Sequence, residues 1–523
     1  MSARLMNAFL TCLLCCGAQA APARFSGDLA AGEQRRLTLA AGAGDYLEGR
    51  LQTAPAGVRL DLLDARGQPV RRLLQPGDGQ QTFRFVADTG MALQVSASVP
   101  TSYALDITRQ VPPAAQQLPV AALESPTLQA LAGHLARGGD SEAFWARIAR
   151  EGAPLIEPAG GGQYRVSFLW RGARRGVKLF GGPARDHLDL ARLGQSDVWY
   201  LTLTVPADTR ASYQLAPDVP VFEGSARERR VVILATAQAD PFNPRSWPDD
   251  APDRFNRHSV LELPAAPPQP GLAEGEPPRG ALSLWQQRSN LLGNSREIAL
   301  YRPAGFQPQD PDNLLLFVFD GPAYRGKVPT PAMLDRLIAE GRLPPVVAVF
   351  VANPDADARA RELPDNPVFA RFMASELLPR VLAETGLAPQ PTRTLLAGSS
   401  YGGLAAASVA LRYPQHFGNV LSLSGSFWWS PPGTEPARQE YLAGLIARQA
   451  RLPLRFSLSA GLFETAQGGT PGILETTRHL RDLLEARDYP VHYREYAGGH
   501  DYLVWRGALA DGLLALFGRP HSP

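Results

Sequence analysis

The sequence predicts a mostly parallel α/β domain in the C-terminal half of the chain, preceded by two all-β, sandwich-like domains. The 523 residues are too many for one compact core, so about three domains are expected. Short segments in the first half alternate apolar and polar residues with period two, which is typical of half-buried strands. From residue 282 onward, apolar strands alternate with helical stretches, the order that builds a parallel sheet covered by helices.

The composition describes a folded protein without a strongly charged surface. Hydrophobic residues make up 45% of the chain, charged residues make up 20%, and the formal net charge is +2. These values exclude an intrinsically disordered chain, and they do not provide the basic surface that nucleic acids need. We expect no nucleic-acid partner.

Residues 1–20 have the pattern of a secretory signal peptide. Arg4 lies near the start, an apolar run covers residues 9–17, and small residues end at Ala20, after which we expect cleavage. All three cysteines lie in this segment, so a lipoprotein signal is the competing interpretation. Cleavage leaves no thiol, which excludes cysteine catalysis and thiolate metal sites. No later apolar stretch reaches the 18 or so residues of a membrane span, and we expect a periplasmic protein without one.

The two all-β domains are predicted at residues 21–110 and 142–265. The first contains alternating runs such as residues 36–39, separated by Gly and Asp. It resembles the pre-peptidase C-terminal type of β-sandwich, and we interpret it as a spacer without chemistry. Residues 111–141 contain a Pro- and Ala-rich linker followed by a helical segment, and residues 266–281 form a second linker that is rich in Pro and Gly.

Residues 282–523 are predicted to form the α/β domain. Continuous apolar runs at residues 313–320 and 346–352 suit strands that are buried on both faces of a sheet. Further strands are expected at residues 392–397, 419–424 and 455–459, and helices at residues 331–340, 367–385, 404–412 and 474–487.

A nucleophile elbow lies between one of these strands and the helix that follows it. Residues 398–402 read Gly-Ser-Ser-Tyr-Gly, which fits the G-x-S-x-G pattern in the context it requires. In such a turn the central residue, Ser400, exposes its hydroxyl, and the flanking glycines avoid collisions. We therefore expect Ser400 to be a catalytic nucleophile.

A serine nucleophile needs a histidine base and a carboxylate that orients this base. Of the eight histidines, His500 follows a predicted strand and a Gly-Gly pair, where this type of sheet delivers its base. Glu464 follows the preceding strand and completes the chain order of serine, acid and histidine. Glu475 and Asp501 are the alternative acids, and Asp501 is disfavoured because neighbours on an extended loop point apart.

Two backbone N–H groups should stabilise the tetrahedral intermediate. One is expected from Tyr401, directly after the nucleophile. The other is expected from the loop after the strand at residues 313–320. Because Pro322 has no N–H, the donor should be Gly321 or Ala323.

Several stretches resemble the enterochelin (enterobactin) esterases, and together they span about residues 143–517. The similar stretches are residues 168–172, 197–200, 210–213, 240–244, 361–363, 398–404 and 421–429. The resemblance implies an α/β-hydrolase fold that cleaves the ester bonds of a ferric or iron-free tricatecholate trilactone. It also supports Ser400, His500 and Glu464 as the catalytic residues. The chain departs from many relatives in its signal peptide, its additional N-terminal sandwich and Pro322.

A ferric tricatecholate is aromatic and anionic, so arginine and aromatic side chains should line its pocket. The candidates are Arg361, Tyr324, Trp428 and Trp429, on loops above the carboxyl ends of the strands. The alternatives are an ion pair between Arg361 and Glu362 and core packing of the two tryptophans. No metal-binding cluster is visible in the sequence, so we expect no metal site and no cofactor in the protein, and any iron would arrive within the substrate.

The leading hypothesis is a periplasmic siderophore esterase that fragments its ligand so that iron is released. A general carboxylesterase of the feruloyl or acylglycerol kind would have the same sheet architecture. A siderophore-binding protein without catalysis would keep the elbow as a relic. The sequence does not indicate which siderophore is preferred or which oligomeric state the protein adopts.

Overall fold

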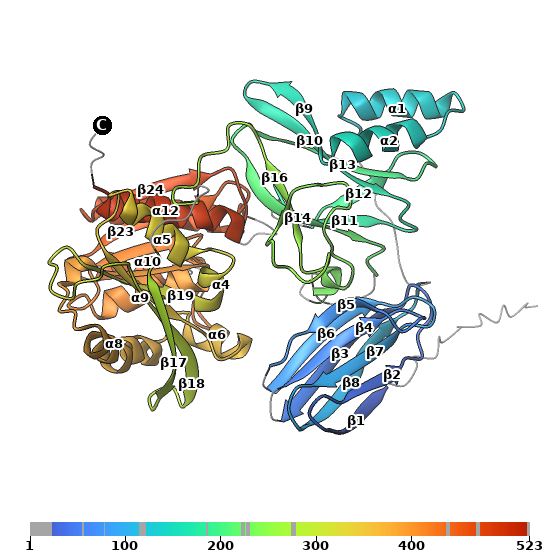
Figure 1. The fold of residues 1–523 in the computed structure, drawn as a ribbon. Helices are drawn as coiled ribbons and strands as arrows, with labels where there is room; N and C mark the ends of the chain where they lie inside the picture. Colours follow the sequence, from blue (N-terminus) through green and yellow to red (C-terminus); the bar gives the residue numbers. More distant parts are fainter. Residues whose placement is uncertain are drawn as a thin grey trace, which may run out of the picture. The chain divides into compact units, whose positions relative to one another are not determined.

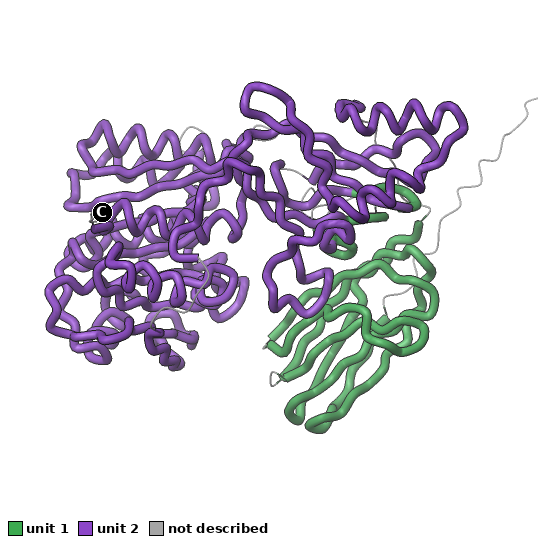
Figure 2. The backbone as a smooth tube through the Cα atoms, turned by 45° about the horizontal axis from the view of Figure 1, so that its top comes forward, with its two compact units in different colours: residues 1–119, 173–177, 216–237 green, residues 120–172, 178–215, 238–523 purple. Residues whose placement is uncertain are grey.

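A computed structural model describes residues 23–54, 57–77, 79–113, 122–184, 187–220, 225, 228, 231–272, 279–435, 440–466 and 471–519. The predicted signal peptide lies outside the described residues, as do residues 114–121 and 273–278 of the predicted linkers. The chain divides into two compact units, which Figure 2 distinguishes by colour. The first comprises residues 1–119, 173–177 and 216–237, and the second comprises residues 120–172, 178–215 and 238–523.

The first unit is built around two four-stranded antiparallel sheets, with strand orders β1-β8-β3-β6 and β2-β7-β4-β5. One apolar core lies between them and includes Leu51, Leu60, Phe83, Val95 and Leu105. This is the sandwich that the period-two alternation predicts. Its strands are β1 (Arg24–Leu29), β2 (Gln34–Thr38), β3 (Tyr46–Ala54), β4 (Val58–Leu63), β5 (Pro69–Leu74), β6 (Gly79–Val86), β7 (Ala92–Ala97) and β8 (Thr101–Val111), and a short helix η2 (Ile233–Ala235) also belongs to the unit.

Two helices and an eight-stranded sheet form what we call the β region. The sheet has the order β15-β16-β14-β11-β12-β13-β10-β9 (Figure 1). Leu128 of α1 and Ile148 of α2 share one core with Leu169 of the sheet. The predicted boundary at residue 142 therefore separates two helices that pack together. The elements are α1 (Pro126–Ala136), α2 (Glu142–Glu151), β9 (Leu155–Gly160), β10 (Gln163–Arg171), β11 (Val177–Gly181), β12 (Asp189–Arg192), β13 (Val198–Pro206), β14 (Arg210–Pro217), β15 (Ser246–Trp247) and β16 (His258–Glu262).

Two carboxylates, the partly exposed Asp197 and the buried Asp240, hold the β region together, and they lie in two of the family-like stretches. Asp197 accepts hydrogen bonds from Trp145 Nε1 at 3.2 Å and Arg171 Nε at 2.7 Å, which fastens α2 to the sheet. Asp240 accepts from the Tyr213 hydroxyl at 2.8 Å, and Asn243 Nδ2 donates to the same hydroxyl at 3.0 Å. These hydrogen bonds stabilise the scaffold of the β region.

The stability of the protein should depend on pH through Asp240. Burial raises the pKa of this carboxyl from 3.8 to about 6, while bonds from Phe242 N and the Tyr213 hydroxyl oppose the rise. The folded protein therefore keeps this proton to a higher pH than the unfolded chain, so the stability contributed by Asp240 falls as pH rises from 4 to 6. The loss should reach about 3 kcal/mol and then level off.

Thermal unfolding of the wild type and the Asp240→Asn variant between pH 4 and 8 measures this effect. The difference in Tm between them should decrease from pH 4 to 6 and stay constant above. A difference that is the same at every pH would contradict the effect.

The α/β region contains an eight-stranded sheet with the order β17-β18-β20-β19-β21-β22-β23-β24. Strands β19 to β24 pair in parallel, and the hairpin β17-β18 adds an antiparallel edge. The strands are β17 (Ala281–Ser289), β18 (Asn294–Arg302), β19 (Leu314–Phe319), β20 (Val346–Val351), β21 (Thr394–Ser399), β22 (Asn419–Leu423), β23 (Arg455–Gly461) and β24 (Val491–Tyr496).

Helices cover both faces of this sheet (Figure 1). Phe369, Leu404 and Leu480 lie in the core on one face, and Leu334 and Leu509 lie in the core on the other. The parallel strands therefore end at one common edge, where the loops gather. The helices are α4 (Gly321–Arg325), α5 (Thr330–Ala339), α6 (Ala356–Glu362), α7 (Pro367–Phe372), η3 (Met373–Leu377), α8 (Leu378–Thr385), η4 (Pro391–Arg393), α9 (Tyr401–Arg412), α10 (Tyr441–Arg448), α11 (Ile473–Ala486) and α12 (Tyr502–Phe517).

None of the helices in the described residues is both long and apolar enough to cross a membrane. No group of three or more His, Cys, Asp or Glu side chains among these residues is arranged to hold a metal ion.

Candidate active site

Ser400 lies in the sharp turn between β21 and α9. Its backbone has φ 58° and ψ −123°, a strained conformation that few non-glycine residues adopt. A Cβ atom on Gly398 would lie 2.6 Å from the carbonyl carbon of Gly402, so this turn requires glycine at position 398. The neighbouring strand fixes the serine, since Ser400 N donates to Leu423 O at 3.0 Å and Ser426 N donates to Ser400 O at 3.0 Å.

Glu464 and His500 are in direct contact. His500 Nδ1 lies 2.6 Å from Glu464 Oε1. The other carboxylate oxygen, Oε2, accepts from Gly461 N at 2.6 Å and from Ser424 Oγ at 2.7 Å. The Glu464 side chain is only 4% exposed. Because two donors occupy one oxygen, the other is left to accept a hydrogen bond from the Nδ1–H of the imidazole. The lone pair then lies on Nε2 and points away from the carboxylate.

The three predicted catalytic residues follow strands of the same parallel set. Ser400 follows β21, Glu464 follows β23 and His500 follows β24, so all three lie at the carboxyl edge of the sheet. Ser400 Oγ is 3.3 Å from Ser426 Oγ. Among the described residues, this is the hydrogen bond that the Ser400 hydroxyl makes, and His500 is not its partner here.

Trp505 holds the imidazole from the side. Its ring meets the ring of His500 edge to face, with the centroids 4.7 Å apart at 87°. Its Nε1 donates to Ser424 Oγ at 3.0 Å. Ser424 therefore links the tryptophan to Glu464, and both of these side chains limit the orientations of His500.

The two alternative acids have other partners. Glu475 accepts from Ala466 N at 3.1 Å near the start of α11. Asp501 begins α12, where its Oδ1 accepts from Leu503 N at 2.8 Å as a helix cap. The carboxylate that contacts His500 is therefore that of Glu464.

The predicted oxyanion donors lie at helix starts. Tyr401 and Gly321 are the first residues of α9 and α4, so neither N–H has an acceptor within its own helix. Ala323 N donates to Asp320 O at 3.0 Å, which makes Gly321 the better placed of the two loop candidates. A Cβ on Gly321 would lie 2.8 Å from the backbone of Phe350, so the loop needs glycine there.

An ion pair that the sequence did not indicate supports this loop. Arg359 donates from Nε and Nη2 to the two oxygens of Asp320 at 2.7 and 2.8 Å, and Asn353 Nδ2 donates to the same carboxylate at 2.6 Å. Asp320 has φ 57° and directly precedes Gly321. The Arg359 guanidinium also lies 5.7 Å from the ring centroid of Tyr401. This arginine therefore connects the oxyanion loop with the elbow.

Arg361 and its neighbour Glu362 do not form the ion pair that we considered. Glu362 turns inward and accepts from Arg296 Nη2 at 2.6 Å and from Asn294 Nδ2 at 2.6 Å. Arg296 is fully buried against aromatic rings. The Arg361 side chain is exposed.

The three aromatic candidates have different surroundings. Tyr324 is wholly buried and packs edge to face against Tyr502, so its ring is part of the core rather than open to a ligand. Trp429 is partly buried against the core. Trp428 is 36% exposed, and its ring centroid lies 6.2 Å from that of Tyr401. Trp428 is therefore the aromatic candidate that lies beside the elbow.

Sequence reasoning missed Ser424, Ser426, Trp505, Asp320 and Arg359. Ser424 and Ser426 lie in a stretch that resembles a known family, but their spacing carries no signal of contact with Glu464 or Ser400. A carboxylate directly before the oxyanion loop, as at Asp320, was the one available hint that a cation would be needed nearby.

Comparisons with known proteins match the chain to one family of enzymes. Residues 165–272 match the family model described as enterochelin esterase, N-terminal, and residues 289–516 match the model described as putative esterase. The iron(III) enterobactin esterase of Dickeya dadantii is 33% identical over 408 residues, which cover 71% of this chain and 92% of that protein.

Two further relatives support this match. The iron(III) salmochelin esterase of Escherichia coli O6:H1 is 30% identical over 77% of this chain and 99% of its own length. A crystal structure of the enterobactin esterase from Shigella flexneri in the presence of enterobactin is similar with a TM-score of 0.59 and 29% identity, covering 72% of this chain and 98% of that one.

Proposed function

We propose the function of this chain from the premise that it belongs to the enterochelin esterase family. It is a serine esterase that hydrolyses the ester bonds of a catecholate siderophore. The names of its relatives indicate enterobactin or salmochelin as this siderophore. The iron-bound trilactone is the proposed substrate, and its cleavage would break one hexadentate ligand into weaker pieces. The observation that carries the proposal is the contact of His500 Nδ1 with Glu464 Oε1 at the edge of the sheet that holds Ser400.

The proposed reaction has two steps. His500 Nε2 takes the proton of Ser400 Oγ as the oxygen attacks the ester carbonyl, and Glu464 stabilises the resulting imidazolium. The carbonyl oxygen becomes an oxyanion that accepts from the N–H groups of Tyr401 and Gly321. The ester bond breaks, and the imidazolium returns the proton to the departing serine hydroxyl of the substrate. This first step requires the Ser400 hydroxyl to exchange Ser426 for His500 as its partner. In the second step His500 takes a proton from water as it attacks the acyl-enzyme, and then returns that proton to Ser400 Oγ as the acid product leaves.

Trp428 and Arg359 are proposed to face the catecholate groups. Trp428 offers an exposed ring beside Tyr401, and the Arg359 side chain is 30% exposed although it pairs with Asp320. An aromatic face and a guanidinium suit a flat, anionic ligand. Arg361 is exposed on the same helix, α6, and remains a weaker candidate.

Replacing Trp428 with alanine should raise KM for the ferric trilactone roughly 10-fold, because an aromatic contact contributes about 1.5 kcal/mol. The kcat should stay close to that of the wild type. A small aliphatic ester such as ethyl acetate, which has no aromatic ring to stack on Trp428, is the matched control substrate. An equal loss on both substrates would show that Trp428 supports the elbow instead of binding the ligand.

Chromatography of the products from purified ferric catecholate trilactone tests the function directly. Linear and monomeric catecholate products are expected from the wild type and not from Ser400→Ala. Activity restricted to feruloyl or acylglycerol esters would indicate a general carboxylesterase. Iron release that survives in Ser400→Ala would indicate a binding protein.

We further propose that the protein is exported and that its first unit is a pre-peptidase-type spacer. Residues 1–20 support export by their signal-peptide pattern. A mature protein whose mass corresponds to a chain beginning at Ala21 in a periplasmic extract is expected, and an uncleaved protein in the cytoplasmic fraction would reject this localisation.

A further inference from the structure

The loop that carries His500 is bonded to strand β14 of the β region at both of its ends. Arg210 N donates to Ala497 O at 2.9 Å, and Ser212 N donates to Oδ2 of Asp501. Between these bonds, a Cβ on Gly498 would lie 2.9 Å from Arg210 O. The two backbones therefore approach each other at a distance that only glycine permits.

The opposite side of the loop packs against the loop that carries Glu464. Phe463 N donates to Gly498 O at 3.1 Å, and Leu462 N donates to Tyr496 O at 2.8 Å. The histidine loop thus lies between two backbones, one from the α/β region and one from the β region. Removing either set of bonds would free the loop on that side.

Asp501, at the end of the histidine loop, contacts both the first turn of α12 and strand β14. Its Oδ1 caps α12 through Leu503 N, while its Oδ2 accepts from Ser212 N. Three basic groups face its carboxylate: His258 of β16, Lys327 after α4 and Arg506 of α12. Desolvation lowers the pKa of each of these groups, and the negative charge of Asp501 opposes the lowering.

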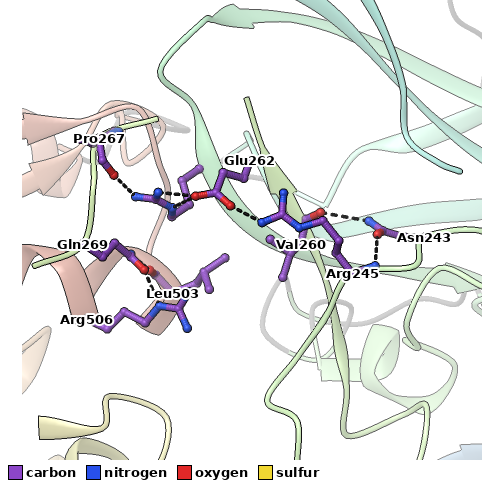
Figure 3. A network of polar contacts seen from close by, with 9 residues as sticks. Asn243, Arg245, Val260, Glu262, Pro267, Gln269, Leu503 and Arg506 are labelled. Carbon is purple, nitrogen blue, oxygen red and sulfur yellow. Dashed lines mark hydrogen bonds and ion pairs between the residues drawn. The ribbon is translucent and has the colours of Figure 1, made fainter. Parts of the chain in front are cut away.

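A second attachment fixes the start of α12, as Figure 3 shows. Gln269, in the segment that connects the β region to the α/β region, donates from Nε2 to Leu503 O at 2.6 Å and accepts from Arg506 Nε at 2.6 Å. Upstream, Glu262 pairs with Arg210 and Arg245. The segment that follows the β region is thus held to the helix after His500 by the side chain of Gln269.

We propose that Asp501 is a positioning residue: it fastens the histidine loop to β14 and so sets the position from which His500 reaches Ser400. Glu464 orients the imidazole about its own axis, but the position of the ring along the loop depends on the backbone from Ala497 to Asp501. The β region is then a structural part of the catalytic site. The proposal rests on the proposed function, in which His500 activates Ser400.

Two substitutions separate the bond of Asp501 to Ser212 N from its bond to Leu503 N, which caps α12. Asn and Ser both cap helices well, so Asp501→Asn and Asp501→Ser should keep the bond to Leu503 N. In Asp501→Asn the side-chain NH2 group faces Ser212 N–H and cannot accept from it. In Asp501→Ser the side chain is too short to reach Ser212. We expect kcat to fall roughly 10- to 100-fold, as for a small misplacement of a catalytic group, with KM unchanged. The rate at which a small organophosphonate labels Ser400 should fall by the same factor.

Asp511→Asn is the matched control. Asp511 lies on the same helix and accepts from the Tyr496 hydroxyl at 2.7 Å and Arg494 Nη1 at 2.7 Å, without contact to β14. It should keep the kcat and the labelling rate of the wild type at temperatures below the unfolding midpoint of each variant. Unchanged kcat and labelling in both Asp501 variants, or losses no larger than those of Asp511→Asn, would overturn the proposal.

Labelling with the organophosphonate also distinguishes a failure of the proposed function from a failure of the proposed role of Asp501. A wild type that is labelled at Ser400 but leaves the trilactone intact would reject the substrate assignment. The labelling rates of the variants would still decide the role of Asp501.

Discussion

Replacing Ser400 with alanine should lower kcat for the ferric trilactone by roughly 10⁴-fold or more, because the attacking oxygen is lost. The fold should be unaffected, since the backbone bonds of Ser400 to Leu423 and Ser426 do not involve its side chain. The affinity for the ferric substrate should remain, because the proposed ligand contacts come from Trp428 and Arg359. Initial rates by chromatography and binding by fluorescence quenching measure these two effects separately.

Ser426→Ala is the control for this experiment. Ser426 Oγ is the hydroxyl that Ser400 contacts, so its loss removes a hydrogen bond but no reacting group. We expect a much smaller change in kcat than for Ser400→Ala. Residual hydrolysis by Ser400→Ala at near the wild-type rate would contradict the assignment of the nucleophile.

Replacing Glu464 with glutamine should lower kcat by roughly 10³- to 10⁴-fold with little change in KM. Gly461 N–H and the Ser424 hydroxyl both donate to Oε2, so the single amide oxygen should occupy that place. The amide nitrogen would then face His500 Nδ1, which has to give up its proton to accept from it. The imidazole would carry its proton on Nε2 and would no longer act as the base.

Glu475→Gln makes the same chemical change in the same part of the chain. Glu475 contacts Ala466 N and not His500, so this variant should keep the kcat of the wild type. If both variants lose the same activity, or if Glu464→Gln remains active, the acid of the triad has been assigned wrongly.

The sequence predicts the central strands well and the surrounding helices less completely. The apolar runs at residues 313–320 and 346–352 correspond to β19 and β20, since a strand that is buried on both faces shows no polar interruption. Helix α12 was not predicted. It is buried along most of its length, so its residues are apolar all round and lack the 3.6-residue pattern of a surface helix.

Candidate site residues can be singled out from the sequence where their chemistry is local. The glycines of its turn indicate Ser400, and positions in loops that follow strands indicate His500 and Glu464; the catalytic roles of all three stay predictions. Tyr324 was misplaced because α4 turns its ring into the core, and the spacing of residues alone does not show this. The pair of Arg359 with Asp320 and the clamp of Asp501 on Ser212 join segments that are far apart in the chain. Such contacts depend on how the segments pack in three dimensions.

Mass spectrometry of the protein after treatment with an organophosphonate tests most directly whether His500 activates Ser400. In the wild type we expect one adduct, on the peptide that contains Ser400, and in His500→Ala we expect the same adduct to form at least about 10³-fold more slowly. An adduct on another residue, or equal labelling rates in the two proteins, would contradict the account.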